Sequence, residues 1–228
     1  MDTALLSLAV APGLAIAIYI FWKDKFEREP KRLMILGFVL GIVSLVPAVL
    51  LEYLWGKWGY SGKGDIQDVA FFAFIVVGFS EEISKFLFLK KFLYPRSAFN
   101  EPYDGITYSV MVSMGFATLE NIMYAADGGY KVALMRMVTA VPAHAVFAII
   151  MGYYVGLAKF DEEKKNLHLL LGILGATLLH GAYDFSLMQQ DYPQFQAIGA
   201  LFSLYIGIRL SRKAIKLHQD NSPFRNEG

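Results

Sequence analysis

The chain has 228 residues, of which 56% are hydrophobic and 15% aromatic, and its formal net charge is +1. This composition is too apolar for an ordinary soluble domain and indicates a membrane protein with several spans, while the near-neutral charge argues against nucleic acid as a partner. The sequence contains no cysteine, which excludes disulfides, thiolate nucleophiles and cysteine-bound metals. No basic segment precedes the first apolar run, so we expect a retained helix rather than a cleaved signal peptide.

Seven apolar runs are long enough to cross a bilayer, since a helix needs about 20 apolar residues to span a core of roughly 30 Å. Irregular backbone cannot face lipid, so the sequence predicts an all-α, polytopic helical bundle. The connections are short, so we expect one transmembrane domain over 1–211 and a basic tail over 212–228. The runs cover approximately 4–22, 33–55, 69–89, 104–125, 133–157, 167–188 and 194–211.

Basic residues gather in every second connection and in the tail, which predicts an N-terminus outside and a C-terminus in the cytoplasm. None precedes the first run, and the outer connections contain few. The predicted cytoplasmic set is Lys23, Lys25, Arg28, Lys31 and Arg32, then Lys90, Lys91 and Arg96, then Lys159, Lys164 and Lys165, then Arg209, Arg212, Lys213, Lys216 and Arg225.

Proline lies inside three of the runs, at Pro12, Pro47 and Pro142. Within a helix each proline frees a backbone carbonyl that neighbouring helices or water must satisfy. Gly115 in the fourth run favours close packing against another helix.

Ionisable and amide side chains interrupt four consecutive runs, although each charge near the bilayer centre costs roughly 2.5–3.5 kcal/mol. Several such residues together must face protein or water, so we expect them to converge on one cavity in the outer half of the membrane. The set comprises Glu81, Glu82, Lys85, Glu120, Asn121, His144, His180 and Asp184.

The spacing of these residues predicts specific pairs. Lys85 lies three and four residues after the two glutamates, Glu82 and Glu81, so it can neutralise one of them and leave the other free for water. His180 and Asp184 are also four residues apart, a geometry in which a carboxylate can fix the tautomer of an imidazole or accept its proton.

Carboxylates and imidazoles in one water-accessible pocket suit general acid–base catalysis. The structural alternative is a set of ion pairs that hold the bundle together, and for Lys85, Asn121 and Asp184 the sequence does not separate the two. Glu52 and Arg136 lie near helix ends, where we expect them to anchor the helices at the membrane interface.

Other mechanisms remain open or are disfavoured by spacing. No HExxH motif is present, but a divalent metal such as zinc, bound by His144, His180, Glu81 and Glu120, is chemically reasonable although nothing in the sequence requires a cofactor. An aspartyl protease is disfavoured, because the GxGD string at 62–65 falls in a polar loop. A proton-coupled transporter using the same residues as a relay is the alternative from another class.

Several strings, in this order, resemble the PrsW family of bacterial membrane proteases, which is distantly similar to CAAX-processing and bacteriocin-processing glutamic-type proteases. The wider superfamily usually shows EExxxR and HxxxN, whereas this chain has EExxK and HxxxD. The matching strings are Ala11-Pro12-Gly13, Asp24, Glu29-Pro30, Glu81-Glu82-x-x-Lys85, Tyr103-Asp104-Gly105-Ile106, Gly115–Asn121 (GFATLEN), His144, Met151–Gly156 (MGYYxG) and Leu179–Asp184 (LHGxYD).

The resemblance implies a multi-pass protease of the bacterial cell membrane that makes the site-1 cut in a membrane-bound anti-sigma factor. A downstream site-2 protease would act on the product and free a sigma factor for a stress response.

The residues then divide into roles that we state as hypotheses. Glu81 acts as general base on a water, Glu82 helps to position that water, and His144 supports the base. His180 donates to the oxyanion, assisted by Asp184 or Asn121. Glu120 protonates the leaving amine or binds a metal.

Overall fold

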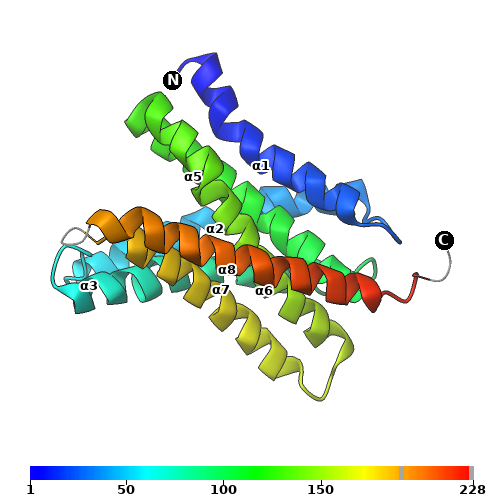
Figure 1. Cartoon of the computed structure of the whole chain (residues 1–228). Coiled ribbons are helices and arrows are strands. Elements are labelled where there is room, and N and C mark those ends of the chain that lie inside the picture. Colours follow the sequence, from blue (N-terminus) through cyan, green and yellow to red (C-terminus); the bar gives the residue numbers. More distant parts are fainter. Residues whose placement is uncertain (190–192, 226–228) are drawn as a thin grey trace.

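The structure, a computed structural model, describes residues 1–189 and 193–225, which form helices joined by short connections (Figure 1). The prediction of an all-α fold is confirmed for this part of the chain. In chain order the elements are α1 (Thr3–Lys23), α2 (Lys31–Lys57), α3 (Ile66–Phe71), the π-helix η1 (Phe72–Phe79), α4 (Ser80–Phe88), the π-helix η2 (Leu89–Leu93), α5 (Pro102–Val138), α6 (Ala140–Phe160), α7 (Lys165–Leu187) and α8 (Pro193–Asp220).

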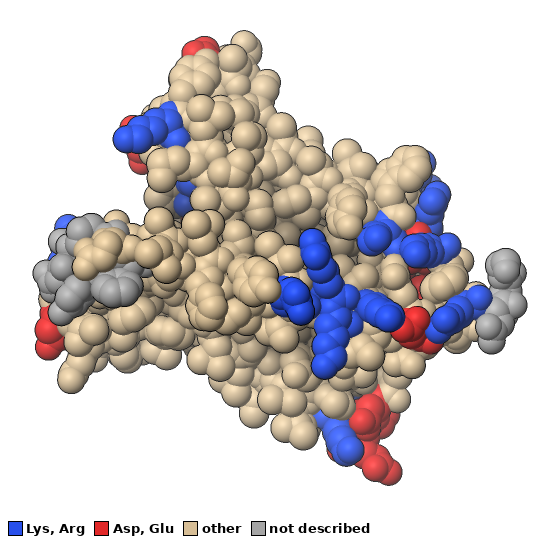
Figure 2. Space-filling model, in the orientation of Figure 1, with Lys and Arg blue, Asp and Glu red and all other residues tan. Residues whose placement is uncertain are grey.

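Four helical stretches are long and apolar enough to cross a membrane: α1, α2, the continuous stretch Pro102–Phe160 that contains α5 and α6, and α7. The chain is thus a multi-pass membrane protein, while the predicted number of seven spans and the orientation of the termini stay predictions. The outer surface of the molecule is of the kind expected for a protein surrounded by lipid. Figure 2 shows a largely uncharged surface on which lysine and arginine gather mainly towards one end of the molecule.

The break predicted between the fourth and fifth runs coincides with a bend at Gly129 inside α5, whereas α6 begins later than the predicted fifth run. Gly129 has φ 66° and ψ −159°, a backbone conformation essentially restricted to glycine. The segment after this bend ends at Val138, and Ala140 starts α6. Pro142 lies in the first turn of α6, where a backbone N–H has no acceptor within the helix, so this proline removes no helical hydrogen bond.

The predicted third helix is divided into α-helical and π-helical turns. η1 directly precedes the turn that carries the paired glutamates, and η2 follows α4. Extra residues in π turns rotate the following side chains relative to a regular helix, and such turns often occur at functional sites. The division sets the direction in which Glu81 and Glu82 project.

α5 is the central helix and is buried along most of its first 17 residues, between α1, α2 and α6. Gly115 confirms the expected close packing, since a Cβ there would overlap the backbone carbonyl of Phe38 on α2. α8 lies across α6 and α7 (Figure 1), and at its far end Gln219 Nε2 donates to the carbonyl of Lys23, 2.8 Å away.

Candidate active site

Glu81, Glu82 and Lys85 lie on consecutive turns of α4 and are all buried. Lys85 Nζ lies 3.2 Å from Glu81 Oε2 and 2.7 Å from Glu82 Oε1, so the ammonium pairs with both carboxylates. It also lies 4.2 Å from the centre of the Phe116 ring. The expectation that the lysine would neutralise one glutamate and leave the other free is therefore wrong.

His180 reaches this cluster from α7. Its Nδ1 lies 2.9 Å from Glu82 Oε1, and its Nε2 lies 3.2 Å from Asp184 Oδ2 and 3.9 Å from Glu81 Oε2. The predicted pairing of His180 with Asp184 is thus present. The ring of Phe147 stacks on His180, with 4.7 Å between ring centres, and limits the orientations open to the imidazole.

Two glycines bring α7 close enough for these contacts. A Cβ on Gly78 would lie 3.2 Å from the backbone nitrogen of Gly181 and 3.3 Å from the carbonyl of Thr177. A Cβ on Gly181 would in turn overlap the side chain of Phe74. Larger residues at either position would push α7 away from η1 and lengthen the distance between His180 and Glu82.

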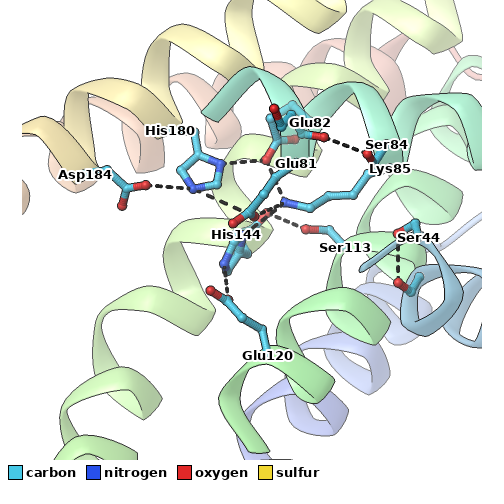
Figure 3. A network of polar contacts seen from close by, with 12 residues as sticks. Ser44, Glu81, Glu82, Ser84, Lys85, Ser113, Glu120, His144, His180 and Asp184 are labelled. Atoms are coloured by element: carbon cyan, nitrogen blue, oxygen red, sulfur yellow. Dashed lines mark hydrogen bonds and ion pairs between the residues drawn. The ribbon is translucent and has the colours of Figure 1, made fainter. Parts of the chain in front are cut away.

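His144 enters from the second turn of α6 and bridges Glu120 and Lys85. Its Nε2 lies 2.9 Å from Glu120 Oε2, and its Nδ1 lies 3.3 Å from Lys85 Nζ. Ser113 Oγ on α5 donates to the His144 carbonyl at 2.9 Å, a hydrogen bond that joins this turn of α6 to α5. Figure 3 shows the resulting network, to which α4, α5, α6 and α7 each contribute.

Arg136 is a member of the site that the sequence did not reveal. Its Nη2 lies 2.6 Å from Glu120 Oε2, so the expected role as an interface anchor is wrong. Its Nε also donates to Asn121 Oδ1 at 3.1 Å, while Asn121 Nδ2 donates to the carbonyl of Ala9 on α1. The signal that could have located Arg136 is the glycine pair at 128–129, which allows the chain to turn back.

Four side chains offer ligand atoms that all lie within 4.8 Å of one another: Glu81, Glu82, His144 and His180. The structure thus groups Glu82, rather than the expected Glu120, with the other three candidate ligands. Two imidazoles and two carboxylates form a donor set that suits zinc.

Two further observations fit a metal at this place. Each histidine directs Nε2 at an outer carboxylate, Glu120 or Asp184, and Nδ1 towards the α4 side chains, as metal-binding histidines commonly do. Glu82 Oε2 is buried and has no hydrogen-bond partner. The Lys85 ammonium contacts three of the four residues, so a metal and this ammonium would compete for the same donors.

Comparison with known proteins agrees with this chemistry. The sequence profile of the family described as PrsW family intramembrane metalloprotease matches residues 29–209. Protease PrsW of Bacillus subtilis (strain 168) is 36% identical over 213 residues, which cover 92% of this chain and 95% of that protein. Protease PrsW of Clostridioides difficile (strain 630) is 38% identical over 198 residues, which cover 82% of this chain and 81% of that protein. No solved structure matches the chain significantly.

Proposed function

Because the chain belongs to the PrsW family of intramembrane metalloproteases and is a multi-pass peptidase of the bacterial membrane, we propose that it makes the site-1 cut in a membrane-bound anti-sigma factor. The observation that carries the proposal is the buried cluster of glutamates and histidines, which four helices supply. Family membership favours proteolysis over a proton-coupled transporter. A site-2 protease would act on the product.

The lengths of the helices support a cut near the outer face. If α5 begins at the cytoplasmic side, Glu120, 18 residues after Pro102, lies about 27 Å along the helix. By the same measure His180, 15 residues after Lys165, lies about 22 Å along α7. In a hydrocarbon core of roughly 30 Å, Glu120 would thus lie near the outer edge and His180 in the outer half.

Glu81, Glu82, His144 and His180 would hold a divalent metal such as zinc, which when bound supplies an activated water and polarises the scissile carbonyl. In the alternative without a metal, Glu81 would accept a proton from the attacking water as general base. Glu82 is held between Lys85 and His180 and orients that water.

In that same alternative, His180 would donate an N–H to the oxyanion that develops on the scissile amide. Asp184 lies beside Nε2 and keeps the imidazole in position, so it acts as an acceptor rather than as a second oxyanion donor. Glu120, expected to protonate the leaving amine or bind a metal, is better placed to orient His144. Arg136 pairs with Glu120, and Asn121 holds α1 beside this part of α5.

The proposal is tested with purified full-length protein and a single-span anti-sigma substrate that carries a different epitope at each end. We expect Glu81→Gln, Glu82→Gln and His180→Ala each to lower the cleavage rate at least 100-fold, as loss of a group that acts in the transition state does. Glu163→Gln, at an exposed acid, is the matched control and should keep the wild-type rate. Wild-type rates in all three variants, or a cut on the cytoplasmic side, would overturn the proposal.

A further inference from the structure

A second group of acidic side chains lies where the α1–α2 connection meets the start of α5. Four of its members are almost fully buried, with 1% of Asp24, 2% of Glu29, 1% of Glu101 and 0% of Asp104 exposed, and Glu27 is half-buried. Asp104 precedes Glu120 by 16 residues on α5, which is about 24 Å along the helix, so this cluster is separate from the candidate active site.

Most of the buried carboxylate oxygens that lack a hydrogen-bond partner belong to this cluster. Among the described residues they are both oxygens of Asp24, Glu27 Oε2, Glu29 Oε1, Glu101 Oε2 and Asp104 Oδ1, and the remaining one is Glu82 Oε2. In Glu29 and Asp104 the second carboxylate oxygen does accept hydrogen bonds. Tyr108 donates to Glu29 Oε2, and the backbone N–H groups of Asn100 and Glu101 donate to Asp104 Oδ2 at 2.8 Å.

The nearby basic side chains do not balance these charges. Arg28 lies over the rings of Phe21 and Trp22, at 5.7 and 5.5 Å from their centres. The ammonium of Lys159 donates to the carbonyl of Tyr94 at 2.7 Å. Within the part of the chain that the structure describes, none of the five acids forms an ion pair.

Ionising these acids without a cation would be costly. Buried charges are normally paired or bound to a metal.

We propose that Glu27, Glu29 and Asp104, with Asp24 beside them, form a binding site for a hard divalent cation. Glu27, Glu29 and Asp104 each offer an oxygen, and these oxygens lie within 4.8 Å of one another. Asp24 supplies two further oxygens without partners. A set made only of oxygen ligands suits Mg²⁺, Ca²⁺ or Mn²⁺ rather than zinc, which separates this site chemically from the histidine-containing cluster.

The cation would join segments that are far apart in sequence. Glu27 and Glu29 immediately precede Pro30 and the start of α2, whereas Asp104 belongs to the first turn of α5. In the predicted topology this end faces the cytoplasm, where Mg²⁺ is the abundant hard divalent cation, so we assign Mg²⁺ as the occupant. Bound Mg²⁺ would hold the α1–α2 connection against α5.

Mn²⁺ binding to the purified, chelator-treated full-length protein tests the site, with free Mn²⁺ counted by electron paramagnetic resonance. We expect Asp24→Asn to bind one equivalent fewer than wild type, and Glu163→Gln, which removes an exposed acid, to bind the wild-type number. We also expect millimolar Mg²⁺ to raise the melting temperature of wild type and to leave that of Asp24→Asn unchanged.

A second variant keeps the test decisive if Asp24→Asn does not fold. Asp104→Asn retains an oxygen that can accept from the two backbone N–H groups, and it too should lose one equivalent. Wild-type Mn²⁺ stoichiometry in both variants, or a wild type that binds no Mn²⁺ attributable to these acids, would overturn the proposal. The readout does not involve proteolysis, so it is independent of the function proposed above.

Discussion

Arg136 Nη2 lies 2.6 Å from Glu120 Oε2, although 16 residues separate them within a continuous helical stretch. In a straight helix that separation would be about 24 Å. The chain closes this distance by bending at Gly129, and Glu120 in turn meets Nε2 of His144 at 2.9 Å. The position of a central histidine therefore depends on the backbone conformation of one glycine near the end of α5.

Gly129→Ala should lower the free energy of unfolding by about 1–3 kcal/mol, because a residue with a Cβ is strained at this combination of φ and ψ. No atom lies within 4 Å of the position that the Cβ would take, so the loss would come from the backbone rather than from a clash. Thermal unfolding in detergent measures the stability. Cleavage should fall as well, because the bend places Arg136 against Glu120.

Gly56→Ala provides the matched control for this substitution. Gly56 lies in the last turn of α2, has no positive φ, and also has open space around its Cβ position. It should keep wild-type activity and be at least as stable as wild type, because alanine is the better helix former. If Gly129→Ala were as stable and as active as Gly56→Ala, the backbone conformation at Gly129 would not be needed for stability or cleavage.

Lys85→Met should destabilise the fold by about 3–5 kcal/mol, because it leaves two buried carboxylates without their shared cation. Adding Glu82→Gln to Lys85→Met should recover part of that loss, and the double-mutant cycle measures the coupling. Lys91→Met, at an exposed lysine, is the control. Additive effects of the two substitutions would contradict a direct interaction between Lys85 and Glu82.

Metal removal should inactivate the protein if the donor set holds a metal as proposed. We expect metal analysis to find a bound divalent ion that depends on His180, and a chelator to abolish cleavage reversibly. Asp184→Asn should weaken metal binding about 10–100-fold, since outer carboxylates orient metal-binding histidines. Asp127→Asn, at an exposed acid of α5, should bind metal as wild type does. Full cleavage by the metal-free protein would leave the glutamate-activated water alone as the mechanism.

His218 should make the folded protein sensitive to acid. Its Nε2 donates to the carbonyl of Tyr153 at 2.8 Å, and burial lowers its pKa to about 4. The unfolded chain therefore takes up a proton at this residue below about pH 6.5, while the folded chain stays neutral until about pH 4. The free energy of unfolding should fall as the pH drops from 6.5 to 4, by up to about 3 kcal/mol at this site.

The measurement compares melting temperatures of wild type and His218→Gln at pH 7 and pH 5. The glutamine amide can still donate to Tyr153 but takes up no proton in this range, so the variant should lose less stability on acidification. His168→Gln, which removes a histidine at the start of α7, should lose as much stability on acidification as wild type does. An unchanged pH response of His218→Gln would exclude this histidine as its source.

The all-helical fold and most members of the candidate site could be predicted from the sequence for a local reason. Hydropathy reports whether a stretch can face lipid, and the cost of burying a charge marks residues such as Glu82 and His180 without knowledge of their partners. The pairing of His180 with Asp184 followed from the geometry of one helix turn. The single exchange in the metal-binding set, Glu82 in place of Glu120, did not follow, since it depends on how α4 packs against α5 and α7.

Residue by residue, the sequence alone determined that this chain is an apolar helical membrane protein with acidic and imidazole groups at specific places, because those properties belong to individual residues and turns. Tertiary structure alone decided that Arg136 supports Glu120, that Lys85 pairs with two glutamates, and that Asp24 and Asp104 belong to one carboxylate cluster. Each of these depends on a bend or a helix crossing that joins distant parts of the chain. Such contacts are set by packing, which no local pattern specifies.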